Sequence, residues 1–100
     1  ATEEVKTIRS GKYVVQYRMK DRNIIRAPKI SVATQDKGIV VVDVVVNRHG
    51  NVIRATPGGV GSTTSSEYLY TKAKFAALGA LFNEHPTGPL ETKGTITITY

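Results

Sequence analysis

Strands are predicted wherever apolar and polar residues alternate along the chain. Residues 39–46 are nearly all β-branched or aliphatic, the turn sequence Asn-Arg-His-Gly follows, and residues 51–56 form a second extended segment. This order is typical of a β-hairpin, because asparagine and a glycine free to take positive φ suit its turn. We expect the face with Val40, Val42, Val44 and Val46 to form the core. Asp43, on the other face, is expected to be partly exposed or to pair with Arg54.

Two other segments alternate in the same way. Residues 13–19 place tyrosine, valine and methionine on one face, and residues 95–100 place Ile96, Ile98 and Tyr100 inward with three threonines outward. If the strand at 39–46 is central in an antiparallel sheet, the last strand lies on an edge.

A helix is predicted from Thr64 to about Glu84. Thr64 and Glu67 have the spacing of a capping box, and Pro86 with Gly88 stops the helix. One stripe of the helix is small and apolar, with Leu69, Ala73, Ala76, Ala77 and Ala80. We expect this stripe and its neighbour, formed by Tyr68, Phe75, Leu78 and Phe82, to be buried in the core. The alternative for the aromatic neighbour is that it covers a sheet edge or the N-terminal segment.

These elements predict an α+β fold: a twisted antiparallel sheet of three or four strands, with one main helix packed on one face. The chain has 100 residues, which is the size of one domain. We expect residues 1–12 to be a flexible N-terminal segment and residues 13–100 to form the domain. Residues 20–37 mix charges with Pro28, which indicates an irregular or short helical connector.

The chain is basic, with a formal net charge of +6. Residues 1–37 contain nine Lys or Arg and four Asp or Glu, so the excess lies in the N-terminal third. Such an excess could attract nucleic acid, anionic lipid or an acidic protein surface. The charges alternate with tyrosine and valine instead of forming a dense run, which favours solvated surface charges over a nucleic-acid site. An anion- or nucleic-acid-binding module is therefore the weakest of the functional alternatives.

No residues suggest catalysis or a cofactor. There is no cysteine, His49 and His85 lack the spacing of metal ligands, and the carboxylates are scattered over separate elements. The glycine-rich segment 57–62 matches neither of the common phosphate-binding motifs, so we interpret it as a connecting loop. The longest apolar stretch, residues 39–46, is too short to span a membrane. We therefore expect a binding protein that has no cofactor or metal and is not an enzyme.

The last strand is the most promising binding feature. A terminal edge strand presents backbone amides and carbonyls to which an extended peptide can add as a further strand. The alternative is that another segment, such as residues 13–19, or the same strand of a second molecule already occupies that edge. In that case the chain is a structural or dimerising domain.

An ordered set of motifs resembles the C-terminal domain of TonB-type energy transducers. The hairpin has a glycine, four alternating valines, a turn glycine and a further valine, at Gly38, Val40 to Val46, Gly50 and Val52. A Gly-Ser-Thr-Thr segment at 61–64 then leads to the alanine-rich helix, and Gly-Thr-Ile-Thr at 94–97 starts the last strand. The resemblance covers residues 38–100 well and residues 22–30 more loosely.

The resemblance implies a periplasmic module of a protein that is anchored in the inner membrane. It would capture the TonB box of an outer-membrane transporter by strand addition to residues Thr95, Ile96, Thr97, Ile98 and Thr99, and would transmit force from inner-membrane motor proteins. Arg26 and Pro28 are candidate partner contacts. Homodimer formation also remains open, as does the structural alternative of a cell-envelope domain with its sheet edge self-occupied. The family's Tyr-Pro pair is Ala27-Pro28 here, and residues 13–19 are additional to the minimal family domain.

Overall fold

A computed structural model describes residues 5–10, 13–19, 22–28, 30 and 37–100. Within these residues the chain is α+β, with one helix packed against an antiparallel sheet, as predicted. The elements are β1 (Val5–Ser10), β2 (Tyr13–Met19), β3 (Ile24–Arg26), β4 (Ile39–Asn47), β5 (Val52–Pro57), α1 (Glu67–Leu78), β6 (Leu81–Phe82) and β7 (Glu91–Thr99).

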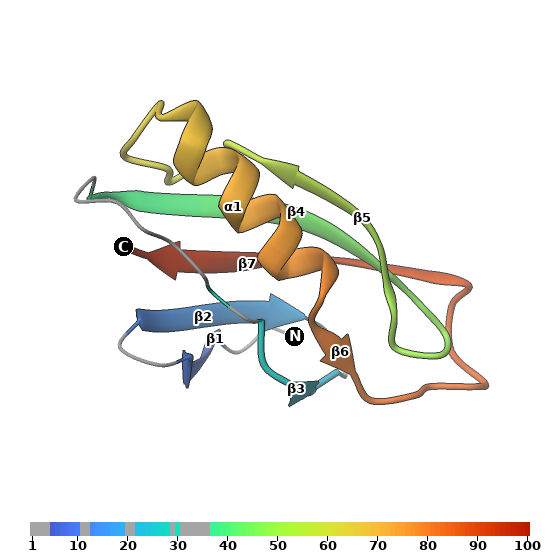
Figure 1. The fold of residues 1–100 in the computed structure, drawn as a ribbon. Coiled ribbons are helices and arrows are strands. Elements are labelled where there is room, and N and C mark those ends of the chain that lie inside the picture. The colour runs from blue at the N-terminus through green and yellow to red at the C-terminus, as the bar shows by residue number, and fades with distance from the viewer. Residues whose placement is uncertain (1–4, 11–12, 20–21, 29, 31–36) are drawn as a thin grey trace.

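The main sheet contains five strands and not the predicted three or four, in the order β1-β2-β7-β4-β5 (Figure 1). Each neighbouring pair in this sheet is antiparallel. The short strands β3 and β6 pair with each other in a separate two-stranded sheet. The strand at the C-terminus therefore lies in the middle of the main sheet.

The β4–β5 hairpin has the predicted form, and its turn is held by a side chain. The Asn47 side-chain oxygen accepts hydrogen bonds from the backbone amides of His49 and Asn51, both at 3.0 Å. Gly50 has a φ of +91°, and its missing Cβ leaves room for the carbonyl of Phe82. The amide of Phe82 in turn donates to the Gly50 carbonyl at 2.8 Å, so the hairpin turn is attached to β6.

Helix α1 is shorter than predicted at both ends. Its N-cap is Ser66, whose hydroxyl accepts from the Leu69 amide at 3.4 Å, so the predicted capping box of Thr64 and Glu67 is wrong. The helix ends at Leu78, before Gly79, because glycine has a low helix propensity. The predicted end at Glu84 is therefore also wrong, since Leu81 and Phe82 form β6.

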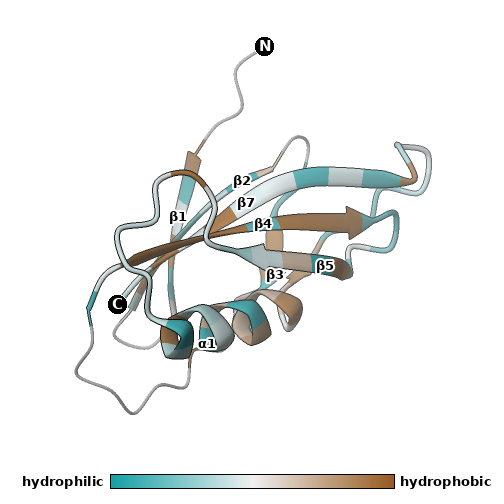
Figure 2. Cartoon of the chain, turned by 90° about the horizontal axis from the view of Figure 1, so that it is seen from above, coloured by the Kyte–Doolittle hydropathy of each residue, from teal (hydrophilic) through white to brown (hydrophobic). Residues whose placement is uncertain are grey.

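The core lies between α1 and one face of the main sheet. The small residues of the helix face the sheet, and the predicted valines of β4 are buried opposite them, as are Ile96 and Ile98. In Figure 2, α1 lies against one face of the sheet, and β4 is brown, which marks hydrophobic residues, over most of its length. The second stripe of the helix does not behave as expected. Phe82 is buried, but Phe75 is 65% exposed, and Tyr68 and Leu78 are exposed as well.

The N-terminal part of the chain also departs from the prediction. Val5–Ser10 form strand β1, so the expected flexible segment at residues 1–12 is wrong for these six residues. Ile24–Arg26 form a strand inside the expected irregular or helical connector. In the same two segments, residues 22–23, 27–28, 30 and 37 have no regular secondary structure, and residues 1–4, 11–12, 20–21, 29 and 31–36 lie outside the described residues.

Candidate functional site

The predicted peptide-binding strand has a neighbour on both sides. Thr97 lies opposite Gln16 of β2 on one flank and opposite Val41 of β4 on the other. The pairing with β2 runs over six residue pairs, from Val14 with Thr99 to Met19 with Gly94. The prediction that the Thr95 strand forms a sheet edge is therefore wrong, because the segment 13–19 occupies the flank that was expected to be free.

Strand β2 is also part of the hydrophobic core. Its inward side chains, Val15, Tyr17 and Met19, are all buried. The Tyr17 ring packs edge to face on Phe82, and its hydroxyl accepts a hydrogen bond from the Ile24 amide at 3.3 Å. Burial of one such side chain contributes about 1.5–3 kcal/mol, so lifting β2 away exposes groups that contribute about 5–9 kcal/mol in total. A guest peptide that supplies only backbone hydrogen bonds would not offset this cost, since each contributes about 1 kcal/mol.

The glycine-rich loop closes the flank of β4 where β5 has ended. The Gly59 amide donates to the Val41 carbonyl at 2.9 Å, and the Val41 amide donates to the Ser62 hydroxyl at 2.9 Å. Thr63 exchanges hydrogen bonds with Ile39 in the same way, through its own amide and its hydroxyl. The Gly59 and Thr63 amides already donate to β4 and are therefore not free to bind a phosphate. These contacts are those of a connecting loop.

Strand β1 is an edge of the main sheet. It pairs with β2 from Val5 to Ser10, and nothing lies beyond it in the strand order. Among the described residues, its backbone forms no hydrogen bond on the side facing away from β2. The strand contains Lys6 and Arg9 and no acidic residue, and β2 adds Arg18. The sheet thus ends in a basic ribbon that an additional strand could extend.

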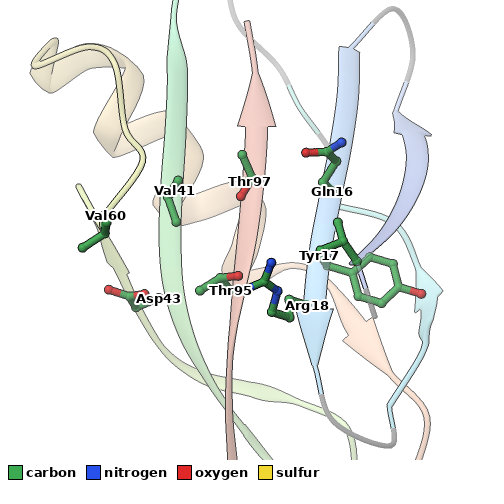
Figure 3. Close-up of a pocket in the computed structure, with 9 residues that line it drawn as sticks. Gln16, Tyr17, Arg18, Val41, Asp43, Val60, Thr95 and Thr97 are labelled. Atoms are coloured by element: carbon green, nitrogen blue, oxygen red, sulfur yellow. The ribbon is translucent and has the colours of Figure 1, made fainter. Parts of the chain in front are cut away.

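The outer face of the sheet, opposite α1, holds a shallow hollow of about 410 Å³ (Figure 3). Its floor is polar, because the strand register places Arg18, Thr95 and Asp43 in one row across β2, β7 and β4. Val5 of β1 lies at one end, and Val60 of the glycine-rich loop, which is 100% exposed, lies at the other. Asp43 is exposed and lies opposite Thr56, while the expected partner Arg54 lies opposite Val45.

The two predicted partner contacts, Arg26 and Pro28, do not belong to the sheet that contains β7. Arg26 is the last residue of β3, and its Nε donates to the Gly79 carbonyl at 3.3 Å. Its side chain is exposed and accessible to a partner. Pro28 is fully buried, so its ring does not offer a contact surface in this structure.

A cluster of tyrosines lies where the last strand ends. The rings of Tyr13 and Tyr100 pack edge to face, with centroids 5.7 Å apart. Burial of the Tyr100 hydroxyl raises its pKa to about 12, and the nearby Tyr13 and Tyr68 add to the shift. The Tyr100 phenol is therefore neutral at ordinary pH and has a packing role.

Sequence reasoning missed β1, because each face of this segment mixes apolar and polar residues, so that its alternation shows only in the burial of the side chains. Val5, Thr7 and Arg9 are exposed on one face, whereas Lys6 and Ile8 are half-buried on the other, which is the alternation of a strand.

Among the described residues, no set of three or more potential ligands is placed to hold a metal ion. Nor does the described part of the chain contain a helix with the length and apolar character to traverse a bilayer.

Comparisons of this chain with protein-family models, with curated proteins and with solved structures gave no significant match.

Proposed function

We propose that this domain is a non-enzymatic, TonB-like binding module that captures an extended segment of an outer-membrane transporter by strand addition. In the full-length protein it acts in the periplasm, anchored to the inner membrane, and transmits force from inner-membrane motor proteins. The hairpin, the alanine-rich helix and the Gly-Thr-Ile-Thr strand support this proposal, because they occur in the order of that family. The guest adds through backbone hydrogen bonds, and it needs a strand with a free flank.

The free flank of β1 is the single observation that carries the proposal. The main sheet ends there without a covering strand or loop among the described residues. Capture at Thr95–Thr99 requires removal of β2 with its three buried side chains, whereas capture at β1 displaces none of the described strands. The geometry therefore favours Val5–Ser10 as the docking strand over the residues predicted from the sequence.

Titration of the isotopically labelled chain with a TonB-box peptide tests both positions. Addition at the edge shifts the amides of Val5–Ser10 and leaves those of Thr95–Thr99 in place. Displacement of β2 instead removes the hydrogen-exchange protection of Tyr13–Met19 and shifts the β7 amides. If every amide stays unchanged at high peptide concentration, the module does not capture peptides by strand addition.

A structural or dimerising cell-envelope domain is the second candidate. The six-residue pairing between β2 and β7 favours it, because the flank of β7 is filled by the chain's own strand. Under this alternative the Thr95–Thr99 amides exchange slowly with or without peptide. Sedimentation then shows either a concentration-independent monomer or a dimer formed through one of the remaining edges.

A further inference from the structure

The side chains along the free edge of β1 favour one class of guest peptide, a selection that backbone hydrogen bonds alone would not make. Strands β1 and β2 together contain Lys6, Arg9 and Arg18 and not one carboxylate. We propose that the segment taken up at this edge is acidic, so that its carboxylates pair with Arg9 and Arg18 while its backbone extends the sheet. This inference rests on the proposed strand addition and adds the class of partner.

The strand register places the basic groups where a guest would meet them. Val5, Thr7 and Arg9 point to the outer face of the sheet, together with Arg18, which lies directly opposite Val5. A guest beside β1 carries every second side chain on this same face. One of its acidic residues lies next to Arg9. The Arg18 side chain extends from β2 towards Thr95 of β7 (Figure 3), so it has to turn towards β1 to meet a second acidic residue beside Val5.

The two guanidinium groups have no competing partner in the described part of the chain. Neither the Arg9 nor the Arg18 guanidinium forms a hydrogen bond or ion pair there. The carboxylate nearest in the strand register, Asp43, is separated from Arg18 by the whole width of β7. Arginine pairs with carboxylates through two parallel hydrogen bonds, so each guanidinium can fix one guest side chain in orientation as well as in charge.

The inner face of the same edge favours an apolar residue in the guest. Ile8 is half-buried and packs against the main core, and Lys6 beside it donates to the Asn23 side chain. A guest side chain next to Ile8 extends that apolar surface. The preferred partner is therefore an extended segment in which acidic and apolar residues alternate.

A second copy of this chain is a poor occupant of the edge. Pairing β1 with β1 of another molecule brings two copies each of Lys6 and Arg9 into one short ribbon that has no acid to balance them. Like charges on neighbouring strands are destabilising, and positive side chains on an edge are a common protection against such self-association.

Two short capped peptides of equal length test the inference. One alternates glutamate with valine, and the other has lysine in place of every glutamate. We expect the glutamate peptide to shift the Val5–Ser10 amides of the labelled chain and the lysine peptide to leave them unchanged. The affinity of the glutamate peptide should fall at least about tenfold in Arg9→Glu and in Arg18→Glu, because attraction becomes repulsion. It should also weaken between about 50 and about 200 mM salt.

Lys74→Glu is the matched control, since it reverses an exposed charge on α1, on the other side of the sheet. An equal loss of affinity in Lys74→Glu means that only net charge matters, and it overturns the inference.

If both peptides shift the Val5–Ser10 amides equally, strand addition stands and the acidic preference is wrong. If neither shifts them, docking at β1 is wrong as well. Dimer formation through β1, or displacement of the glutamate peptide by a single-stranded oligonucleotide, also counts against an acidic peptide partner.

Discussion

The rings of Tyr17 and Phe82 pack edge to face, with centroids 5.8 Å apart and ring planes at 76°. This contact joins β2, which covers the last strand, to the short strand that follows the helix. Aromatic pairs in this geometry add about 0.5–1.5 kcal/mol to the contribution of their buried area. Strand β2 is therefore part of the packed core, and a peptide that competes for β7 must break this contact.

Val15→Ala should lower the free energy of unfolding by about 2 kcal/mol, because removal of this fully buried side chain leaves a cavity in the core. Gln16→Ala is the control, since the neighbouring side chain is exposed and its loss should change stability by less than about 0.5 kcal/mol. Urea denaturation followed by circular dichroism measures both. Equal effects would mean that β2 is only loosely attached to the core.

Gly50→Ala should strongly destabilise the chain. Gly50 has a φ of +91°, and an added Cβ would collide with the carbonyl of Phe82. We expect a loss of more than about 2 kcal/mol, from the strained turn and from the contact that must open. Gly79→Ala is the matched case, because its φ is −86° and the nearest atom to an added Cβ lies at 3.6 Å. Thermal unfolding should rank Gly79→Ala at or above the parent chain.

Arg22 is 1% exposed and donates from one nitrogen to the carbonyls of Asn47 and Asn83, at 2.9 and 3.1 Å. It thereby holds the end of β4 against the segment that follows β6. Arg22→Met keeps much of the volume but leaves both carbonyls without this donor, so we expect a loss of about 3 kcal/mol. Arg26→Met removes one bond at an exposed site and should cost less than about 1 kcal/mol. Similar losses in chemical denaturation would contradict this role for Arg22.

Stability should fall at high pH in a way that depends on Tyr100. Its pKa is raised to about 12, chiefly by burial, from 10.0 for a free tyrosine. Folding therefore favours the neutral phenol: this contribution is fully present below pH 10 and is lost as the pH rises from 10 towards 12. Tyr100→Phe should flatten that part of the stability curve, while ultraviolet absorbance of the parent follows the phenolate. A curve of the same shape in both proteins would show that other groups cause the decline.

The alternation of apolar and polar residues and the turn residues sufficed to predict those elements that depend only on residues close in the sequence. The β4–β5 hairpin follows from alternating valines and from a turn that needs Gly50. The inward direction of Ile96 and Ile98 follows from strict alternation. The end of the helix was misjudged because the prediction relied on Pro86, whereas Gly79 ends the helix earlier and Phe82 gains a strand partner in Ile24.

The strand order depends on pairings between distant residues, which one sequence does not reveal. Val15 and Ile98 lie opposite each other although nearly the whole chain separates them. Strand β1 forms because its backbone pairs with the amides and carbonyls of β2 along six residues. This pairing outweighs the low strand propensity of its polar residues. The candidate docking strand is therefore β1 and not β7, because β7 has a neighbouring strand on both sides.

An engineered disulfide between β2 and β7 distinguishes the two possible docking strands. Gln16 and Thr97 lie directly opposite each other, and such pairs have Cα atoms about 4.5–5.5 Å apart, within the range that a disulfide spans. The chain has no cysteine, so Gln16→Cys with Thr97→Cys forms a unique bridge when oxidised. We expect the oxidised chain to bind peptide as tightly as the reduced chain, because β1 remains free. Calorimetric titration in both redox states measures this, with the single Thr97→Cys variant as control. Binding that disappears on oxidation and returns on reduction would show that the guest replaces β2 beside Thr95–Thr99.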